Sequence, residues 1–439
     1  MIGPELGAFA FVALLALLAL RIPIGVSMIA VGLGAYLVMR GVSPTLAYVK
    51  NTSFSAFADY GLSVVPLFLL MGQFATRAGM SKALFNAANV FLGHRRGGVA
   101  MASVGACAGF GAICGSSLAT AATMAQVALP EMRRFGYSGA LSTGSLAAGG
   151  TLGILIPPSV VLVIYAILTE QNIAKMFVAA LLPGFLAALG YVLAIAVYVR
   201  FRPDAGPTGE RAGAAARRKA VAETWPVVAI FLLVIGGIYA GWFTPTEGAA
   251  VGAFSTLLLA IFHGGMRWQG FVDSLKGTAE ASAMIFLIIL GAKLFNGMLA
   301  LTQLPQSAAL FIGDSGLAPM AVLAVMLLIY LLLGCVMDSL SMILLTVPIF
   351  FPIVTALDFG MTPEETAIWF GILALIVVEV GLITPPVGMN VFIINSLARD
   401  VPMLDSFRGV LPFLLSDAAR VIILIVFPII TLGLVNLLW

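Results

Sequence analysis

Apolar stretches long enough to cross a membrane recur along almost the whole chain, and this feature restricts the fold more than any other. Hydrophobic residues make up 61% of the 439 residues and charged residues only 9%, far from the balance of a soluble domain. A spanning helix needs about 20 mostly apolar residues, and the sequence offers roughly ten such stretches. They are apolar all round and lack the alternation of barrel strands, so the sequence predicts an all-α polytopic membrane protein.

The two halves of the sequence repeat one pattern. Gly153 and Gly381 are each followed, after three residues, by a Pro-Pro pair. Three further pairs of landmarks lie 222 positions apart: Pro23 with Pro245, Ser117 with Ser339, and Pro130 with Pro352. Landmarks in the same order at a near-constant offset predict two copies of one unit. We place the copies at residues 1–199 and 225–439, joined by a basic, Gly- and Pro-containing linker at 200–224 that is expected in the cytoplasm.

The first copy contains a long uncharged segment, residues 97–130. Arg95 and Arg96 precede this segment and Arg133 and Arg134 follow it, so both of its ends are expected to face the cytoplasm. At about 1.5 Å per residue, two helical arms of this length reach roughly 25 Å each, less than a hydrocarbon core of about 30 Å. The segment is therefore predicted to be a re-entrant helical hairpin that opens to the cytoplasm.

The corresponding segment of the second copy, about 318–356, has the opposite charge environment. Residues 294–398 contain no Lys or Arg, and the loop after the segment carries Asp358, Glu364 and Glu365. This hairpin is predicted to open to the outside. Two hairpins that enter from opposite faces are typical of an inverted-topology repeat, and an even number of spans then places both termini outside, in the periplasm.

Pro-Pro pairs interrupt two further apolar helices, at about 137–169 and 367–398. A proline removes an N–H and clashes with the carbonyl four residues before it, so Pro157 should free the carbonyl of Gly153, and Pro385 the carbonyl of the matching glycine. Broken helices present bare carbonyls to cations and helix N-termini to anions, so two breaks predict two cation sites. The alternative, in which Gly and Pro only kink and pack these helices, stays open.

The hairpin tips are the candidate cavity-lining segments. Residues 114–117 are small and polar, and non-helical backbone at membrane depth is tolerated only against protein or a water-filled cavity. Asp338, at the second tip, has no basic residue nearby in sequence, so it is expected to face water, substrate or sodium. The alternative is a carboxylate satisfied by the hydroxyls of Ser339 and Ser341. For Glu379, upstream of the second break, a functional and a structural role are equally open.

Three runs resemble the large membrane subunit of tripartite ATP-independent periplasmic (TRAP) transporters. They are residues 114–171 (CGSSLATAATMAQVALPEMRRFGYSGALSTGSLAAGGTLGILIPPSVVLVIYAILTEQ), residues 333–354 (LGCVMDSLSMILLTVPIFFPIV) and residues 381–393 (GLITPPVGMNVFI). The resemblance covers essentially the whole chain. It implies sodium-driven import of a small organic acid, such as a dicarboxylate or sugar acid, across a bacterial inner membrane by an elevator movement. It also implies two partners, a small membrane subunit and a periplasmic substrate-binding protein.

The same resemblance implies site residues. Two or more sodium ions and no organic cofactor are expected. One sodium site would involve Ser116, Gly153, Ile156 and Pro158. The other would involve Gly334, Gly381, Thr384 and Val387. Substrate contacts would come from Cys114, Ser116, Ser117, Ser159 and Asp338, with Cys114 standing where many relatives carry Ser.

Two rival functions follow from the same sequence. An ion-coupled organic-anion symporter or antiporter that works alone would share the hairpins and the inverted repeat. An intramembrane enzyme is not expected, because the sequence has no HExxH and no Gly-Xaa-Gly-Asp motif, and the nucleotide site of a primary pump is not expected either, because no Gly-Lys dipeptide exists. No nucleic-acid partner is expected.

Overall fold

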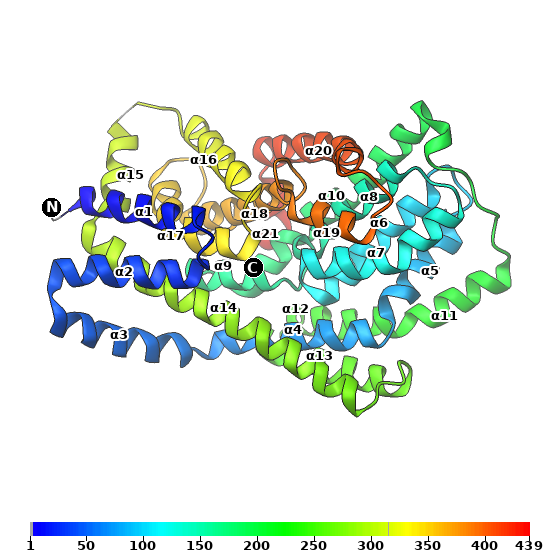
Figure 1. Cartoon of the computed structure of the whole chain (residues 1–439), viewed down its shortest axis with the longest axis horizontal. Helices are drawn as coiled ribbons and strands as arrows, with labels where there is room; N and C mark the ends of the chain where they lie inside the picture. Colours follow the sequence, from blue (N-terminus) through cyan, green and yellow to red (C-terminus); the bar gives the residue numbers. More distant parts are fainter. Residues whose placement is uncertain (1–2, 315) are drawn as a thin grey trace.

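Helices account for the regular elements in the part of the chain that the structure describes. The computed structural model describes residues 3–314 and 316–439 (Figure 1). In the N-terminal half the helices are α1 (Pro4–Ala19), α2 (Ile24–Arg40), α3 (Val42–Phe57), α4 (Val64–Arg77), α5 (Met80–Leu92), α6 (Gly98–Cys114), α7 (Ser117–Arg134), α8 (Gly139–Leu155), α9 (Val160–Leu168) and α10 (Ile173–Phe201). The predicted all-α class is confirmed.

The C-terminal half has a similar order of long and short helices. They are α11 (Ala214–Phe231), α12 (Gly237–Tyr239), α13 (Pro245–Phe262), α14 (Trp268–Thr302), α15 (Leu304–Asp314), α16 (Pro319–Gly334), α17 (Ser339–Ala356), α18 (Pro363–Gly381), α19 (Met389–Leu397), α20 (Met403–Val426) and α21 (Ile429–Leu438). Helices α7 and α17 both have 18 residues, and α9 and α19 both have nine. The segments expected to be hairpins and broken helices are occupied by α6–α7, α16–α17, α8–α9 and α18–α19.

By length and composition, six helices of the described residues can cross a membrane, or up to eight if each of two bent pairs is one span. The protein is therefore a multi-pass membrane protein with fewer such spans than the roughly ten that the sequence suggests. The difference arises because α1, α2, α6, α16 and α21 are apolar but only 10–17 residues long. Helices α8 and α9 form one of the bent pairs, with an angle of 44° at the break.

Helices of one half pack against helices of the other in a reciprocal pattern. Helix α2 packs on α14, and α4 packs on α13; α7 packs on α19, and α9 packs on α17. Helix α8 packs on α20 and α10 packs on α18 in the same way. Figure 1 shows α14 running along α2 and past α4, so the halves are intertwined instead of lying side by side as separate lobes. The division into copies at 1–199 and 225–439 stays a prediction.

Both hairpins turn at a capped helix start. At the first tip, Gly115 adopts φ 64°, a left-handed conformation that favours glycine. The side chain of Ser116 then caps α7 by accepting a hydrogen bond from the N–H of Ala119 at 3.4 Å. At the second tip, the side chain of Asp338 caps α17 by accepting from the N–H of Ser341 at 3.0 Å. Ser and Asp are preferred N-caps because their oxygens satisfy free N–H groups of the first turn.

Glycines let the first arm of each hairpin touch the broken helix of the same half. A Cβ atom added to Gly111 on α6 would lie 2.5 Å from the Cα of Gly153 on α8. A Cβ atom added to Gly381 on α18 would lie 2.6 Å from the Cα of Gly334 on α16. The two crossings use backbone against backbone, as small residues allow between membrane helices. Each hairpin is thereby held against its own broken helix.

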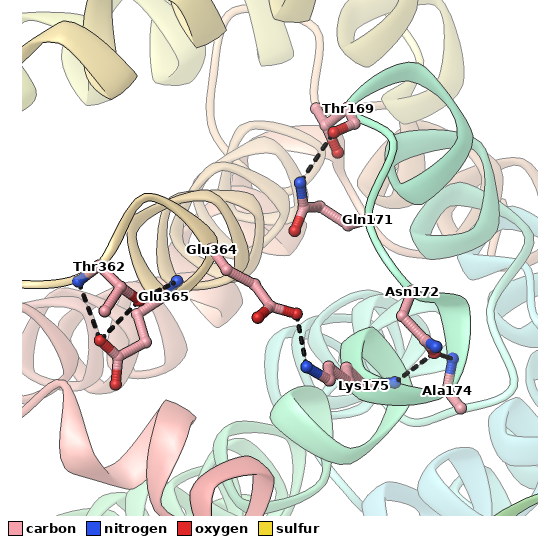
Figure 2. A network of polar contacts seen from close by, with 8 residues as sticks. All are labelled: Thr169, Gln171, Asn172, Ala174, Lys175, Thr362, Glu364 and Glu365. Carbon is pink, nitrogen blue, oxygen red and sulfur yellow. Dashed lines mark hydrogen bonds and ion pairs between the residues drawn. The ribbon is translucent and has the colours of Figure 1, made fainter. Parts of the chain in front are cut away.

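Ion pairs join the halves at loop ends. Lys175, at the start of α10, pairs with Glu364, at the start of α18, with 2.6 Å between Nζ and Oε1 (Figure 2). The side chain of Asn172 caps α10 beside this pair, and Glu365 forms a capping box with Thr362. A second pair joins Arg133, at the end of α7, to Asp400, before α20. These contacts link helix ends of the two halves at exposed positions.

Candidate functional site

A cavity of about 180 Å³ lies where the two hairpin tips meet. Ser116 and Ser117 line it from the first tip, and Asp338 and Ser339 line it from the second. The remaining lining residues come from α4, α7, α8, α9, α14, α17 and the segments beside them: Leu69, Gly115, Leu118, Ile154, Val160, Val161, Ala281, Met284, Ile285, Leu340 and Leu382. The cavity is therefore mainly apolar, with polar groups concentrated at the tips.

Three helix starts reach this cavity. The lining includes Ser117 of α7, Val160 of α9 and Ser339 of α17, each the first residue of its helix. The first N–H groups of a helix have no partner within the helix and carry a partial positive charge. Helix N-termini are therefore ready-made sites for anionic groups. The cavity can accept hydrogen bonds from a ligand at its side chains and donate them from its backbone.

The carboxylate of Glu379 lies behind the tips and joins them. The Ser117 hydroxyl donates to its Oε2 atom, and the Ser339 hydroxyl donates to its Oε1 atom at 2.5 Å. Glu379 is fully buried on α18. Within residues 3–314 and 316–439 no lysine or arginine forms an ion pair with it. Its charged neighbours, Arg420 and Asp417 of α20, pair with each other at 2.7 Å.

Asp338 lies at the cavity, but its hydrogen-bond partner differs from the one suggested by the sequence. The alternative interpretation assigned the hydroxyls of Ser339 and Ser341 to this carboxylate. In the structure the backbone N–H of Ser341 donates to Asp338, and the Ser339 hydroxyl donates to Glu379. The interpretation based on hydroxyls is wrong because helix capping uses the N–H groups of the first turn. One carboxylate oxygen of Asp338 serves the cap.

The structure places Cys114 and Ser159 beside the cavity, outside its lining. Cys114 is buried at the end of α6, and its backbone lies 3.2 Å from a Cβ added to Gly72 on α4. Ser159 is fully buried and caps α9 by accepting from the N–H of Leu162 at 3.4 Å. Their roles as substrate contacts stay predictions.

The first predicted sodium set comes together around a buried hydroxyl. A Cβ added to Gly153 would lie 2.7 Å from the carbonyl oxygen of Ser116 and 2.5 Å from the Oγ1 atom of Thr120. Thr120 is fully buried, and among the described residues this Oγ1 atom makes no hydrogen bond of regular geometry, although the Cys114 thiol lies next to it. The carbonyl of Pro158 lies 3.1 Å from a Cβ added to Gly115. Ile156, the C-cap of α8, lies in the same break. Buried oxygens without a regular hydrogen bond suit a cation.

The residues of the second predicted sodium set also lie close together, but one predicted free carbonyl is hydrogen-bonded. Gly334 and Gly381 touch, and Gly388 lies 3.2 Å, measured from an added Cβ, from the carbonyl oxygen of Thr384. The carbonyl of Gly381 is not left free by Pro385, because it accepts a hydrogen bond from the N–H of Thr384 at 3.0 Å. The tight turn at the end of α18 supplies this donor. Val387, the remaining member, is about one-third exposed in the same break.

The described residues contain no group of three or more His, Cys, Asp or Glu side chains that could hold a metal ion. A cation at either break would therefore be held by carbonyl and hydroxyl oxygens. Oxygen ligands of this type suit hard cations. The residues present fit such an ion.

Sequence reasoning missed Thr120 as a candidate ligand and the joint role of Ser117, Ser339 and Glu379. Thr120 lies one helical turn after Ser116, and this spacing on one face of α7 was the available signal. The Glu379 contacts bring together residues from three helices of both halves. No local pattern indicates such contacts.

A larger hollow of about 630 Å³ lies between α10 and α20, away from the hairpin tips. Its walls are mostly apolar, with Arg202 and Arg420 among them. It contains none of the residues predicted from the sequence. The smaller cavity at the tips is the candidate site because polar side chains, helix starts and broken helices meet there.

Broken helices that meet at a small polar cavity are typical of membrane transporters. The fold agrees with this class. A crystal structure of the Alcanivorax borkumensis YdaH transporter aligns with a TM-score of 0.64 at 14% identity, covering 88% of this chain and 89% of that one. At this identity the likeness concerns the fold alone.

The sequence matches the family described as "Tripartite ATP-independent periplasmic transporter, DctM component" over residues 11–430. It is 38% identical to the C4-dicarboxylate TRAP transporter large permease protein DctM of Pseudomonas aeruginosa, over 87% of this chain and 88% of that protein. It is 32% identical to the sialic acid TRAP transporter large permease protein SiaM of Vibrio cholerae, over 95% of this chain and 96% of that protein. The chain belongs to the DctM family of TRAP transporter large permeases and is a transporter subunit, not an enzyme.

Proposed function

We propose that this permease imports a small organic acid, coupled to sodium, by moving the cavity between the two faces of a bacterial inner membrane. The observation that carries the proposal is the cavity between the hairpin tips, with Ser116, Ser117 and Asp338 in its wall. Its volume of about 180 Å³ is below the roughly 300–1,000 Å³ of pockets for drug-sized ligands. A small metabolite suits this space.

An acid is the substrate class that the cavity favours. The N–H groups at the starts of α7 and α17 lie at the lining, where they can bind a carboxylate. The relatives transport different acids by name, a C4-dicarboxylate in one case and sialic acid in the other. A site built largely from backbone groups is compatible with such variety among relatives.

Sodium coupling is supported by oxygen atoms near the first break. The buried Oγ1 atom of Thr120 makes no hydrogen bond of regular geometry within the described part of the chain, and it lies beside the carbonyl of Ser116. Ser116 also lines the substrate cavity. One residue would therefore contact both the ion and the cavity, so that ion binding can order the tip that binds the acid. The second set, around Gly381 and Thr384, would hold a second ion.

An elevator movement is supported by the composition of the cavity wall. The hairpin tips supply the polar part, while Leu69 of α4 and Met284 of α14 supply an apolar part. Helices α4 and α14 pack on α13 and α2 respectively. This group would form a fixed scaffold, and the hairpins with the broken helices would slide along it. An apolar surface allows sliding because it forms no directional hydrogen bonds.

Two partners complete the proposed transporter, a small membrane subunit and a periplasmic binding protein. Membership in a family of tripartite transporters supports both partners. The chain would lie with both termini in the periplasm, the first hairpin opening to the cytoplasm and the second to the periplasm. The arginines beside α6 and α7 and the acidic residues before α18 agree with this orientation.

The proposal is tested in lipid vesicles that contain the permease and the small subunit, with the binding protein added outside. We expect accumulation of the acid only under an inward sodium gradient. Asp338→Asn should abolish accumulation, whereas Asp405→Asn, on the exposed start of α20, should not. Equal uptake without sodium would overturn the coupling. Full uptake without the binding protein would instead identify a transporter that works alone.

A further inference from the structure

The hydroxyl protons of Ser117 and Ser339 point away from the cavity that these serines line. Each serine donates to a different oxygen of Glu379. An ionised carboxylate has no hydrogen to give, so the two serines must be the donors. A hydroxyl has one proton and two lone pairs, so the lone pairs are what each serine can offer to the cavity that both line.

Asp338 also offers only hydrogen-bond acceptors to the cavity. Asp338 accepts the N–H of Ser341 and lines the cavity with an acceptor-only carboxylate. Ser116 caps α7 with its hydroxyl oxygen. Ser117, Ser339 and Asp338 therefore offer hydrogen-bond acceptors to the cavity, while the Ser116 hydroxyl and the backbone N–H groups at the helix starts can donate. The two kinds of group occupy the same small space.

We infer that Glu379 sets this polarity and thereby selects acids that carry a hydrogen-bond donor, a hydroxyl or an ammonium group, close to the carboxylate. The inference rests on the proposed function and narrows its substrate class. The carboxylate of such an acid binds the helix starts, and its hydroxyl or ammonium group donates to Ser117, Ser339 or Asp338. Glu379 does not touch the substrate and acts as a positioning residue.

The two serine hydroxyls support Glu379 as an ionised acceptor of two hydrogen bonds, because hydrogen bonds donated to a carboxylate favour its charged form. Arg420 and Asp417 pair at 2.7 Å, and Tyr191 of α10 donates to Asp417 at 2.9 Å. The two serine hydroxyls are therefore the direct hydrogen-bond donors to Glu379 among the described residues.

The test compares malate with succinate, two acids that differ by one hydroxyl. The permease with its small subunit is reconstituted in lipid nanodiscs with sodium, and the affinity for each acid is measured from ligand-dependent thermal stabilisation. We expect malate to bind the wild type more tightly by about three- to tenfold, the value of one hydrogen bond. In Glu379→Gln the amide N–H donates to one serine, and the hydroxyl proton of that serine becomes free to point into the cavity. The ratio of malate affinity to succinate affinity should then fall to about one.

Two further variants separate polarity from general damage. Ser117→Ala keeps Glu379 but removes one acceptor, and it should also reduce the malate preference. Glu364→Gln, an exposed carboxylate on the same helix, should leave the preference unchanged. An unchanged ratio in both Glu379→Gln and Ser117→Ala would overturn the inference, as would a wild type that does not prefer malate. Sodium-driven uptake in vesicles tests the proposed function separately and can fail or succeed independently of this ratio.

Discussion

Ser117 and Ser339 lie 222 positions apart in the sequence, yet they donate hydrogen bonds to the two oxygens of one buried carboxylate. They are the first residues of α7 and α17, the second arms of the two hairpins. Glu379 therefore connects equivalent points of both halves. The same two serines line the cavity between the hairpin tips.

Adding a methyl group at Gly111 should destabilise the protein. Its Cβ would lie 2.5 Å from the Cα of Gly153, and overpacking of this kind costs about 1–3 kcal/mol. Gly111→Ala should lower the melting temperature of the purified protein. Gly105→Ala is the matched control on the same helix, because no atom lies within 4 Å of its added Cβ. Equal melting temperatures for the two variants would contradict the close crossing of α6 and α8.

Removing the hydroxyl of Thr120 should weaken the response to sodium. Thr120→Val keeps the shape of the side chain and removes an oxygen that makes no regular hydrogen bond to any residue that the structure describes. The sodium concentration for half-maximal uptake should rise by about three- to tenfold, the value of one lost oxygen contact, while Thr120→Ser should retain the wild-type value. Thr355→Val, on the exposed end of α17, is the control. An unchanged sodium dependence in Thr120→Val would remove this residue from the ion site.

A bulky side chain on the scaffold wall should block the cavity. Met284 of α14 lines it and is 57% exposed. Met284→Trp is expected to abolish uptake, because the larger side chain would fill the cavity. It should not lower the melting temperature, because the indole enters open space and displaces no packed side chain. Leu275→Trp, at a half-exposed position elsewhere on α14, should transport normally. Normal uptake by Met284→Trp would show that substrate does not pass this wall.

Single-cysteine variants can test the opposite orientation of the hairpins. Cys114 and Cys335 are buried in this structure, so a membrane-impermeant thiol reagent should label Cys114 from the cytoplasmic side and Cys335 from the periplasmic side, each in the transport state that opens its hairpin tip. Cys107, fully buried against Gly149, should stay unlabelled and serves as the reference. Labelling of Cys114 and Cys335 from one face only is the outcome that contradicts an inverted repeat.

The ion pair between Lys175 and Glu364 should contribute little to stability. The Glu364 side chain is about half exposed, and such pairs are worth about 0.2–1 kcal/mol. Lys175→Ala should therefore lower the melting temperature only slightly, and high salt should remove the difference from the wild type. A large, salt-independent loss would assign this contact a structural role beyond charge.

Local chemistry made the helices and the tips predictable from the sequence. A run without charge predicted the α6–α7 segment, and a run without Lys or Arg predicted the α16–α17 segment. The small polar residues 114–117 and Asp338 predicted the tips. The two Pro-Pro pairs predicted the breaks after α8 and α18. These features depend on neighbouring residues, which a sequence displays directly.

Contacts between distant helices could not be predicted in the same way. The alternative interpretation paired the Ser339 hydroxyl with Asp338 because the two are adjacent, but α18 brings Glu379 close enough to accept that hydrogen bond. The carbonyl of Gly381 was expected to be free, but the turn after α18 supplies the N–H of Thr384. Thr120 was not recognised as a candidate ligand, because the packing of α8 on α7 is what buries its hydroxyl without a regular hydrogen bond among the described residues. Tertiary packing decides each of these cases.

The intertwined arrangement of the halves constrains how the chain assembles during synthesis. Helices α2, α4 and α7 leave the ribosome long before α14, α13 and α19, the helices on which they pack. The early helices must therefore reside in the lipid with their future contact faces uncovered until the second half is inserted. Truncation after the linker would leave those faces exposed permanently, so quality-control proteases should remove such a fragment.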